Sequence, residues 1–150
     1  MKLAVGSDER THLTDTVLLW LQEHGHTLTL YGPIQPGHAD PWPIVARQVA
    51  EAVANGDADE GILFCWTGTG VSIAANKVPG IRAALCDDPE TARGARLWND
   101  ANVICLSLRR TSEVRAREIL TAWFEQAYQP NPTDDSCLAQ IRDLESAYRG

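Results

Sequence analysis

A cysteine followed by a glycine-containing turn is the strongest chemical signal in the sequence. Residues 65–70 (CWTGTG) follow an apolar run and precede a segment with helical periodicity. Backbone N–H groups converge at a helix N-terminus, and their partial positive charge favours an anion or an enolate oxygen. The same field favours the thiolate of a nearby cysteine, which can act as a base or a nucleophile. The segment predicts a proton-transfer site at Cys65, with a purely structural turn as the alternative.

The spacing within this turn excludes two common motifs. A nucleotide-binding P-loop has Lys followed by Ser or Thr directly after its second glycine, whereas Val71 and Ser72 follow Gly70 here. A nucleophile elbow places its nucleophile between two glycines, whereas Cys65 precedes both glycines of the turn. We therefore expect neither a nucleotide phosphate loop nor a site of the α/β-hydrolase type.

Three polar residues near the ends of predicted elements are further candidates for ligand binding. Asp8 follows the first predicted strand, where its carboxylate can accept hydrogen bonds from sugar hydroxyls or cap the next helix. For Asn99, the alternative to ligand binding is likewise helix capping, because Asn is a common capping residue. Arg109 follows the last predicted strand and can hold an anion, although a lone arginine is usually solvated.

The cysteines and histidines show no spacing typical of a metal site. The four cysteines include no Cys-x-x-Cys pair, and the four histidines do not complete a ligand set with them. We expect buried, reduced thiols at Cys86 and Cys105, because free cysteine is among the most often buried residues. We expect neither a metal nor another cofactor.

Short apolar runs alternate with longer amphipathic segments, and these elements would position the candidate residues. The predicted strands are residues 2–6, 27–31, 61–65, 82–85 and 102–106. The predicted helices are residues 11–24, 42–55, 71–77, 89–97, 111–128 and 134–148. Such alternation indicates right-handed crossovers and one parallel, doubly wound α/β sheet. Ligands bind beyond the carboxyl ends of such strands, where Cys65 and Asp8 stand.

The length and composition are typical of one globular domain. The chain has 150 residues, and its 20 acidic and 13 basic residues give a net charge of −7. This acid excess disfavours nucleic-acid binding, which needs a basic surface to displace counterions. No apolar run reaches the roughly 18 residues of a membrane span, and no signal peptide is evident. We expect a cytoplasmic protein that binds a small molecule and has no membrane or nucleic-acid partner.

Several motifs, taken in order along the chain, resemble one enzyme family. Residues 61–85 (GILFCWTGTGVSIAANKVPGIRAAL), 99–103 (NDANV) and 6–8 (GSD) look like the corresponding segments of B-type ribose-5-phosphate isomerases and related galactose-6-phosphate isomerases. The resemblance extends from the first predicted strand to the fifth. It implies a Rossmann-like three-layer α/β/α sandwich with a five-stranded parallel sheet.

The resemblance also implies an activity and an assembly. Members of this family interconvert aldose and ketose phosphates through a cis-enediolate, without a metal. They form homodimers, sometimes paired into tetramers, whose active sites are shared between two subunits. For this chain the resemblance implies one isomerase domain, residues 1–150, in which residues 129–150 form a helical extension that packs on the dimer partner.

The positions that match the family motifs imply roles for individual residues. Cys65 would move the proton between C1 and C2 of the sugar, and Thr67 would assist ring opening. Asp8 would bind sugar hydroxyls, Arg109 would contribute to the phosphate site, and Asn99 would reach in from the neighbouring subunit. The enediolate oxygen would be held by preorganised amides of the turn, those of Trp66, Thr67, Gly68, Thr69 and Gly70.

The chain departs from the family pattern at positions that would surround the substrate. Glu9 replaces a histidine, and Trp98 replaces the histidine that opens the sugar ring. Trp66 replaces a glycine, and Trp42 stands near the position of a tyrosine. We expect all four residues at the substrate site, with core packing as the alternative for the three tryptophans.

A second group of departures would weaken phosphate binding. Thr133 and Cys137 align near two phosphate-binding arginines of the family. Each lost charge-assisted hydrogen bond is worth about 1.5–3 kcal/mol, and Glu9 would add repulsion. The leading hypothesis is thus an aldose–ketose isomerase acting on a divergent sugar, phosphorylated or not. The alternatives are a recruited proton-transfer or elimination enzyme for a non-phosphorylated metabolite, and a non-catalytic ligand-binding module.

Overall fold

Five parallel strands form one sheet, in the order β2-β1-β3-β5-β4, in the computed structural model, which describes residues 1–149. The strands are β1 Lys2–Ser7, β2 Thr27–Tyr31, β3 Glu60–Cys65, β4 Ala83–Leu85 and β5 Val103–Ser107. The α-helices are α1 His12–Glu23, α2 Trp42–Ala54, α3 Thr69–Ala75, α4 Pro89–Asn99, α5 Glu113–Glu125 and α6 Pro132–Ala147. A short 3-10 turn, η1 Gly32–Ile34, follows β2. The predicted parallel α/β fold is confirmed.

Helices α4 and α5 differ from the prediction at three boundaries, for identifiable reasons. The predicted helix 111–128 is shorter, because the Ser112 side chain caps its start and Gln126 is extended. Helix α4 continues to Asn99, beyond the predicted end at residue 97, and stops where Asp100 adopts a left-handed conformation. Capping side chains and positive φ angles end helices in ways that hydrophobic periodicity does not reveal.

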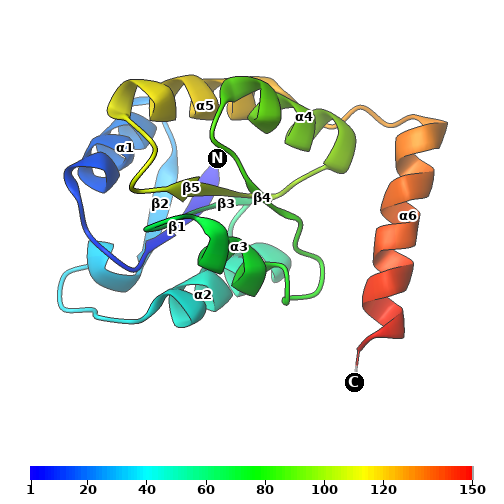
Figure 1. The fold of residues 1–150 in the computed structure, drawn as a ribbon, viewed down its shortest axis with the longest axis horizontal. Helices are drawn as coiled ribbons and strands as arrows, with labels where there is room; N and C mark the ends of the chain where they lie inside the picture. The colour runs from blue at the N-terminus through cyan, green and yellow to red at the C-terminus, as the bar shows by residue number, and fades with distance from the viewer. Residues whose placement is uncertain (150) are drawn as a thin grey trace.

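Helices cover both faces of the sheet, so the central strands are buried on each side. Helices α1, α4 and α5 lie on one face and α2 and α3 on the other (Figure 1). Strand β3 is buried along its whole length. Its Ile62 and Phe64 side chains join the core under the first face, and Leu63 and Cys65 join the core under the second. This alternation places the Cys65 side chain on the α2–α3 side of the sheet.

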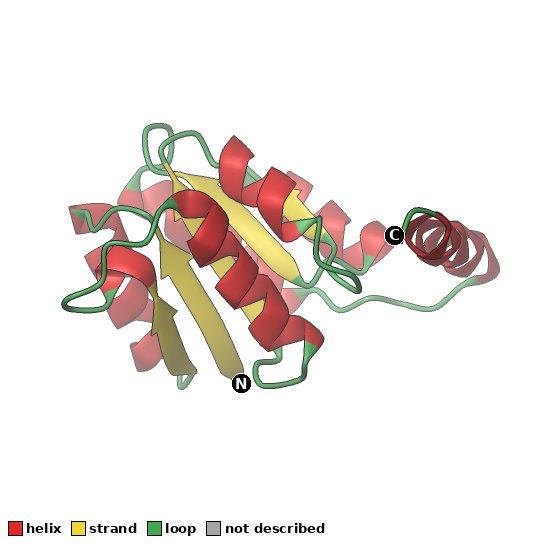
Figure 2. Cartoon of the chain, turned by 90° about the horizontal axis from the view of Figure 1, so that it is seen from below, coloured by secondary structure: helices red, strands yellow, loops and turns green. Residues whose placement is uncertain are grey.

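Helix α6 stands apart from the rest of the chain. An extended connector leads to it, and its axis runs beside the three layers rather than within them (Figure 2). Leu138 is the buried residue of this helix, and the Glu145 carboxylate accepts a hydrogen bond from the Gly80 N–H at 2.8 Å. The exposed fractions of Ile141 and Leu144 are 49% and 55%, so α6 presents apolar side chains that residues 1–149 leave uncovered.

None of the helices within residues 1–149 is long and apolar enough to cross a bilayer.

Candidate active site

A pocket of about 270 Å³ opens at the carboxyl edge of the sheet, where β1 and β3 end side by side. It brings together residues from three segments that are far apart in the sequence. Two of these segments leave the ends of neighbouring parallel strands, and the third begins α2. The pocket is lined by Asp8, Trp42, Cys65, Trp66, Thr67, Thr69 and Gly70. All seven belong to the site expected from the sequence.

The turn between Cys65 and α3 needs glycine at its centre. Gly68 has a φ of 76°, and a Cβ placed there would lie 2.6 Å from Cδ1 of Leu85. The Thr67 and Thr69 hydroxyls are hydrogen-bonded to each other at 2.7 Å. Because the first N–H groups of a helix have no intrahelical acceptor, the start of α3 offers donors toward the pocket.

Strand β5 holds the same turn from its other side. The Leu108 N–H donates to the carbonyl of Cys65 at 2.9 Å, and the Arg109 N–H donates to that of Trp66 at 3.0 Å. The Ser107 hydroxyl adds a second donor to the Trp66 carbonyl at 3.0 Å. Sequence reasoning missed Ser107, which pairs with Cys65 in the sheet. The signal that could have found Ser107 is its position at the carboxyl end of the last strand along the chain.

Asp8 lies in the pocket and does not cap the following helix. Helix α1 is capped instead by Thr11, whose side chain accepts from the Thr14 N–H at 3.2 Å. Partial burial raises the pKa of Asp8 above its ordinary value, and the nearby Glu9 charge raises it further. Glu9 itself is exposed and does not line the pocket, contrary to the expectation from the sequence. Its backbone is held to the Ser7 hydroxyl, which keeps the chain turning away.

The three tryptophans are not core residues. The exposed fractions of Trp42, Trp66 and Trp98 are 41%, 59% and 59%. Their exposure excludes the core-packing alternative. Trp42 and Trp66 line the Cys65 pocket, whereas Trp98 does not.

The remaining cysteines are separate from this site. Burial raises the pKa of Cys86 to about 12, and burial also raises that of Cys105, so both remain thiols at neutral pH. Both were expected to be buried and reduced, and this is confirmed. Cys137 is exposed on α6. Within residues 1–149, no three His, Cys, Asp or Glu side chains come together as metal ligands.

A second cavity, of about 430 Å³, adjoins the first across two shared residues, Thr67 and Thr69. The predicted Arg109 lines it, and so does Arg110, which sequence reasoning did not single out. The Arg110 guanidinium lies 4.0 Å from the Asp87 carboxylate. The cavity therefore places two cations next to the Cys65 pocket, one of them paired with the carboxylate of Asp87, which also lines the cavity.

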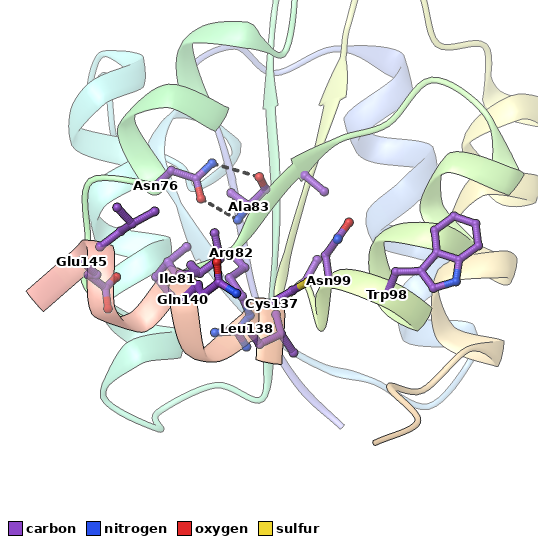
Figure 3. A pocket seen from close by; sticks show the side chains of 14 residues that line it. Asn76, Ile81, Arg82, Ala83, Trp98, Asn99, Cys137, Leu138, Gln140 and Glu145 are labelled. Carbon is purple, nitrogen blue, oxygen red and sulfur yellow. Dashed lines mark hydrogen bonds between the residues drawn. The ribbon is translucent and has the colours of Figure 1, made fainter. Parts of the chain in front are cut away.

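Trp98 and Asn99 lie at the opposite edge of the sheet. They end α4, directly before β5 begins, whereas Cys65 pairs with the last residue of β5. Five residues of strand span about 16 Å, so one chain does not bring Asn99 to the Cys65 thiol. Both residues instead line a cavity of about 770 Å³ between α6 and the sheet (Figure 3). The expectation that Trp98 lines the Cys65 pocket is therefore wrong for a single chain.

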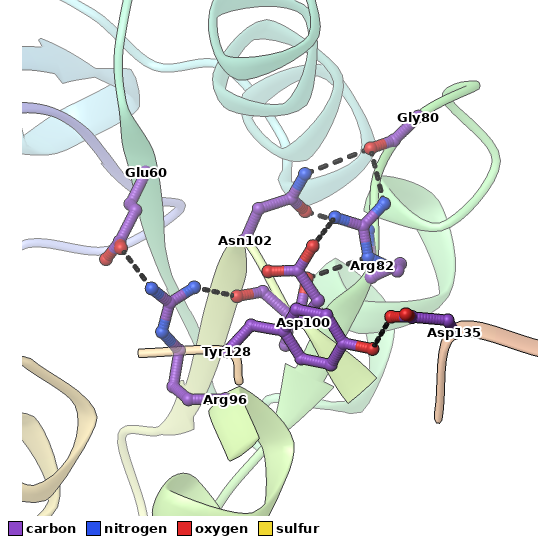
Figure 4. A network of polar contacts seen from close by, with 9 residues as sticks. Glu60, Gly80, Arg82, Arg96, Asp100, Asn102, Tyr128 and Asp135 are labelled. Carbon is purple, nitrogen blue, oxygen red and sulfur yellow. Dashed lines mark hydrogen bonds and ion pairs between the residues drawn. The ribbon is translucent and has the colours of Figure 1, made fainter. Parts of the chain in front are cut away.

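A polar network holds the end of α4 in place (Figure 4). Arg82 donates to the Asp100 carbonyl at 2.7 Å and pairs with its carboxylate at 3.3 Å. Nearby, Arg96 pairs with Glu60 at 2.9 Å, and the Trp123 indole N–H donates to the same carboxylate at 2.6 Å. Burial raises the pKa of Glu60, although Arg96 and Trp123 both act to lower it.

Comparison with known proteins supports the expected family. The sequence pattern of the ribose/galactose isomerase family matches residues 3–141. The chain belongs to this family. The isomerase is 39% identical, over 130 residues and 86% of each chain, to a D-erythrulose-4-phosphate isomerase of Pectobacterium atrosepticum. It is 40% identical to ribose-5-phosphate isomerase B of Escherichia coli over 129 residues. This match covers 85% of the present chain and 86% of the Escherichia coli chain.

The fold of the isomerase agrees with a solved structure from the same family. Ribose-5-phosphate isomerase B of Clostridium thermocellum has a TM-score of 0.92 and 35% identity, with coverage of 99% of this chain and 100% of that one. The expected family and three-layer α/β architecture are therefore confirmed. The protein is an aldose–ketose isomerase of this type.

Proposed function

We propose that the isomerase moves a proton between C1 and C2 of a four-carbon sugar phosphate through a cis-enediolate, with Cys65 as the base. The observation that carries this proposal is the pocket at the carboxyl edge. There the Cys65 thiol shares one small space with the Asp8 carboxyl and the start of α3. A base, a group that orients hydroxyls and a set of N–H donors are the parts that such a proton transfer requires.

The chemical step uses these parts in sequence. The Cys65 thiolate takes the proton from C2 of the aldose, and the electron pair moves through the new C1–C2 double bond to O1. Backbone N–H groups between Thr67 and Gly70 stabilise the enediolate oxygen. The Cys65 thiol then returns the proton to C1 while the O2 proton moves to O1, which gives the ketose. Asp8 accepts hydrogen bonds from the sugar hydroxyls, and the Thr67 hydroxyl donates to a sugar oxygen.

A four-carbon substrate agrees with the replacement of a histidine by Trp98. The family resemblance assigns the ring-opening step to that histidine. A tetrose 4-phosphate cannot close a five-membered ring, because its O4 carries the phosphate. An enzyme for such a sugar needs no ring-opening group. One relative with 39% identity carries the name D-erythrulose-4-phosphate isomerase, and we extend that substrate class to this chain.

The phosphate of this substrate would lie in the adjoining cavity. Arg109 and Arg110 line that cavity, which meets the Cys65 pocket at Thr67 and Thr69. Charge-assisted hydrogen bonds from arginine to phosphate are about twice as strong as neutral ones. Two cations on the same chain would thus take over from the two family arginines that Thr133 and Cys137 replace.

A second copy of the chain would complete the site. Because Asn99 is far from Cys65 in its own chain, Asn99 of the partner subunit is the one that would reach the pocket. We propose that residues 129–150 pack on that partner and that the exposed Ile141 and Leu144 become buried there. Light scattering should therefore show a homodimer. The double change Ile141→Asp and Leu144→Asp should give monomers, whereas Ser136→Asp on the same helix should not.

Solvent deuterium exchange tests the activity directly. In D₂O, the isomerase should incorporate deuterium at the carbon next to the carbonyl of D-erythrulose 4-phosphate and form the aldose. Cys65→Ala should slow this incorporation by about 10²–10⁴-fold, and Cys105→Ala, which removes a core thiol, should keep it. Unchanged incorporation in Cys65→Ala would refute the cysteine base. Faster turnover of ribose 5-phosphate than of the four-carbon sugar would refute the substrate class.

One observation favours a second candidate function, proton transfer on a non-phosphorylated metabolite. The Glu9 charge raises the pKa of Asp8, so a negative potential reaches the pocket from this side. A neutral substrate would avoid that repulsion. Cys65-dependent deuterium incorporation into free erythrulose, but not into its 4-phosphate, would establish this alternative. Binding of a sugar without any deuterium exchange would instead identify a non-catalytic ligand-binding module.

A further inference from the structure

Two tryptophans flank the Cys65 pocket, and their indoles are the largest side chains around it. Trp42 is 41% and Trp66 59% exposed, although indole is usually well buried in folded proteins. An exposed aromatic surface next to a polar pocket is typical of a wall that a ligand covers on binding. The two indoles therefore offer exposed aromatic surface to a ligand in the pocket.

Trp42 is a rigid wall. It is the first residue of α2, between Pro41 and Pro43, whose rings restrict the backbone on both sides. A Cβ placed on Gly70 would lie 3.1–3.3 Å from atoms of the Trp42 ring, so the indole rests directly on the start of α3. The ring is therefore supported from one side by α3 and exposed on the other.

Trp66 is fixed at its backbone and free at its ring. Its carbonyl accepts two hydrogen bonds of 3.0 Å, from the Ser107 hydroxyl and the Arg109 N–H. Cys65, directly before it, is 5% exposed. A change of side chain at position 66 therefore alters the space above the thiol without releasing the turn that carries it.

We infer that Trp66 determines how long a sugar chain the Cys65 pocket accepts. This inference rests on the proposed isomerase function and adds the residue that selects the substrate. The pocket has a volume of about 270 Å³, and Trp66 lines it together with Cys65, Thr67 and Asp8. Trp66 occupies space that a smaller residue would leave open, so a four-carbon chain fits and a fifth carbon meets the indole.

The expected size of this selection follows from other enzymes. One additional carbon in a shaped pocket typically changes kcat/KM by roughly 10–200-fold. Substitution Trp66→Gly should therefore change the ratio of kcat/KM for D-erythrulose 4-phosphate to that for D-ribulose 5-phosphate by a factor in this range, in favour of the five-carbon sugar. Trp66→Leu, which keeps an apolar side chain of intermediate size, should give an intermediate ratio.

The test compares three variants with the wild-type isomerase. Both sugars are assayed with Trp66→Gly, Trp66→Leu and Leu19→Ala, the last a removal of an apolar side chain 57% exposed on α1. Thermal unfolding and light scattering verify that each variant keeps its fold and its assembly. A graded change of the ratio from wild type through Trp66→Leu to Trp66→Gly, with Leu19→Ala unchanged, supports the inference. An equal ratio in all four proteins overturns it, as does an equal loss of both activities.

A binding measurement separates this inference from the proposed function. The four-carbon and five-carbon aldonic acid phosphates cannot be isomerised, and their dissociation constants are measured by calorimetry. A shift of preference toward the five-carbon acid in Trp66→Gly supports the role of Trp66 even if the wild-type protein isomerises neither sugar. An unchanged preference overturns that role even if Cys65-dependent isomerisation is found.

Discussion

The two edges of the sheet are organised in opposite ways. At the carboxyl edge, two loops and the start of α2 present exposed tryptophans and a partly buried Asp8 around the Cys65 thiol. At the amino edge, Glu60 and Arg96 form an ion pair with side chains 8% and 14% exposed, and Arg82 pairs with Asp100. The first edge has exposed side chains around a cysteine. The second edge has ion pairs between its own side chains, next to the cavity lined by Trp98 and Asn99.

From this difference we expect activity and stability to be located at different ends of the molecule. The carboxyl ends of parallel strands lie at one edge of the sheet, and the loops that follow these ends bind ligands. The opposite edge joins strands and helices, and it also carries Asn99, which we propose reaches the active site of a partner subunit. Substitutions at the carboxyl edge should therefore reduce activity with little effect on folding, and those in the Glu60–Arg96 ion pair should do the reverse.

The largest expected effect is on activity at the carboxyl edge. Cys65→Ala should lower kcat/KM by about 10²–10⁴-fold, the usual contribution of a general base. Because the side chain is small, the free energy of unfolding should change by about 1 kcal/mol or less, as for the loss of little more than a methylene-sized group. Steady-state kinetics and urea unfolding of the same preparation measure the two quantities. A variant that unfolds much more easily would contradict the separation of the two edges.

At the amino edge, the expected effect is on stability. Glu60→Gln leaves Arg96 without its anionic partner in a buried setting and should cost about 3–5 kcal/mol of unfolding free energy. The double change Glu60→Met and Arg96→Met should recover most of it, because apolar pairs often replace buried ion pairs without loss. Glu51→Gln, which breaks an exposed pair with Arg47, is the control and should cost about 0–1 kcal/mol. Equal costs for Glu60→Gln and Glu51→Gln would remove the basis of the comparison.

A smaller effect is expected at Asp100, which has a φ of 45° and is the one non-glycine residue with positive φ among residues 1–149. Asp100→Ala and Asp100→Gly both lose the carboxylate that pairs with Arg82. Glycine adopts the left-handed conformation without strain, whereas alanine does not, so the glycine variant should be more stable by about 1 kcal/mol. Chemical denaturation of both variants measures the difference. An alanine variant as stable as the glycine variant would show that the turn relaxes.

The smallest effect concerns pH. Partial burial lowers the pKa of His26, and the N-terminal ammonium and His24 lower it further. Between the lowered folded pKa and the ordinary value of 6.5, the unfolded chain binds more protons than the folded chain. The contribution of His26 to stability is therefore complete above pH 6.5 and is lost as the pH falls.

Urea midpoints at pH 7.5 and pH 5 measure this dependence. The wild-type midpoint should fall more on acidification than that of His26→Gln. The His26 ring stacks on Phe124 with 4.6 Å between centroids, so the comparison is made between pH values within each variant. An identical pH dependence in wild type and His26→Gln would refute the role of His26.

Local sequence signals were sufficient for much of the fold and for the centre of the site. The alternation of apolar runs with helical periodicity predicted five parallel strands, and the segment that contains Cys65 and Gly68 was placed correctly at the end of one of them. Asp8 was identified because it directly follows a strand. These features depend on neighbours in the chain, and they can therefore be recognised in it.

Other parts of the site depend on contacts between distant segments. The role of Ser107 depends on the register of β5 against β3, and the pairing of Arg110 with Asp87 depends on two loops meeting in space. The sequence alone determined the strand order along the chain, the turn at Cys65 and the family. Only the tertiary structure decided that Trp66 lines the pocket and that Asn99 lies at the opposite edge of the sheet. The physical reason is the direction of α4. This helix runs back along the sheet, so its last residues lie away from the carboxyl ends of the strands, where Cys65 stands.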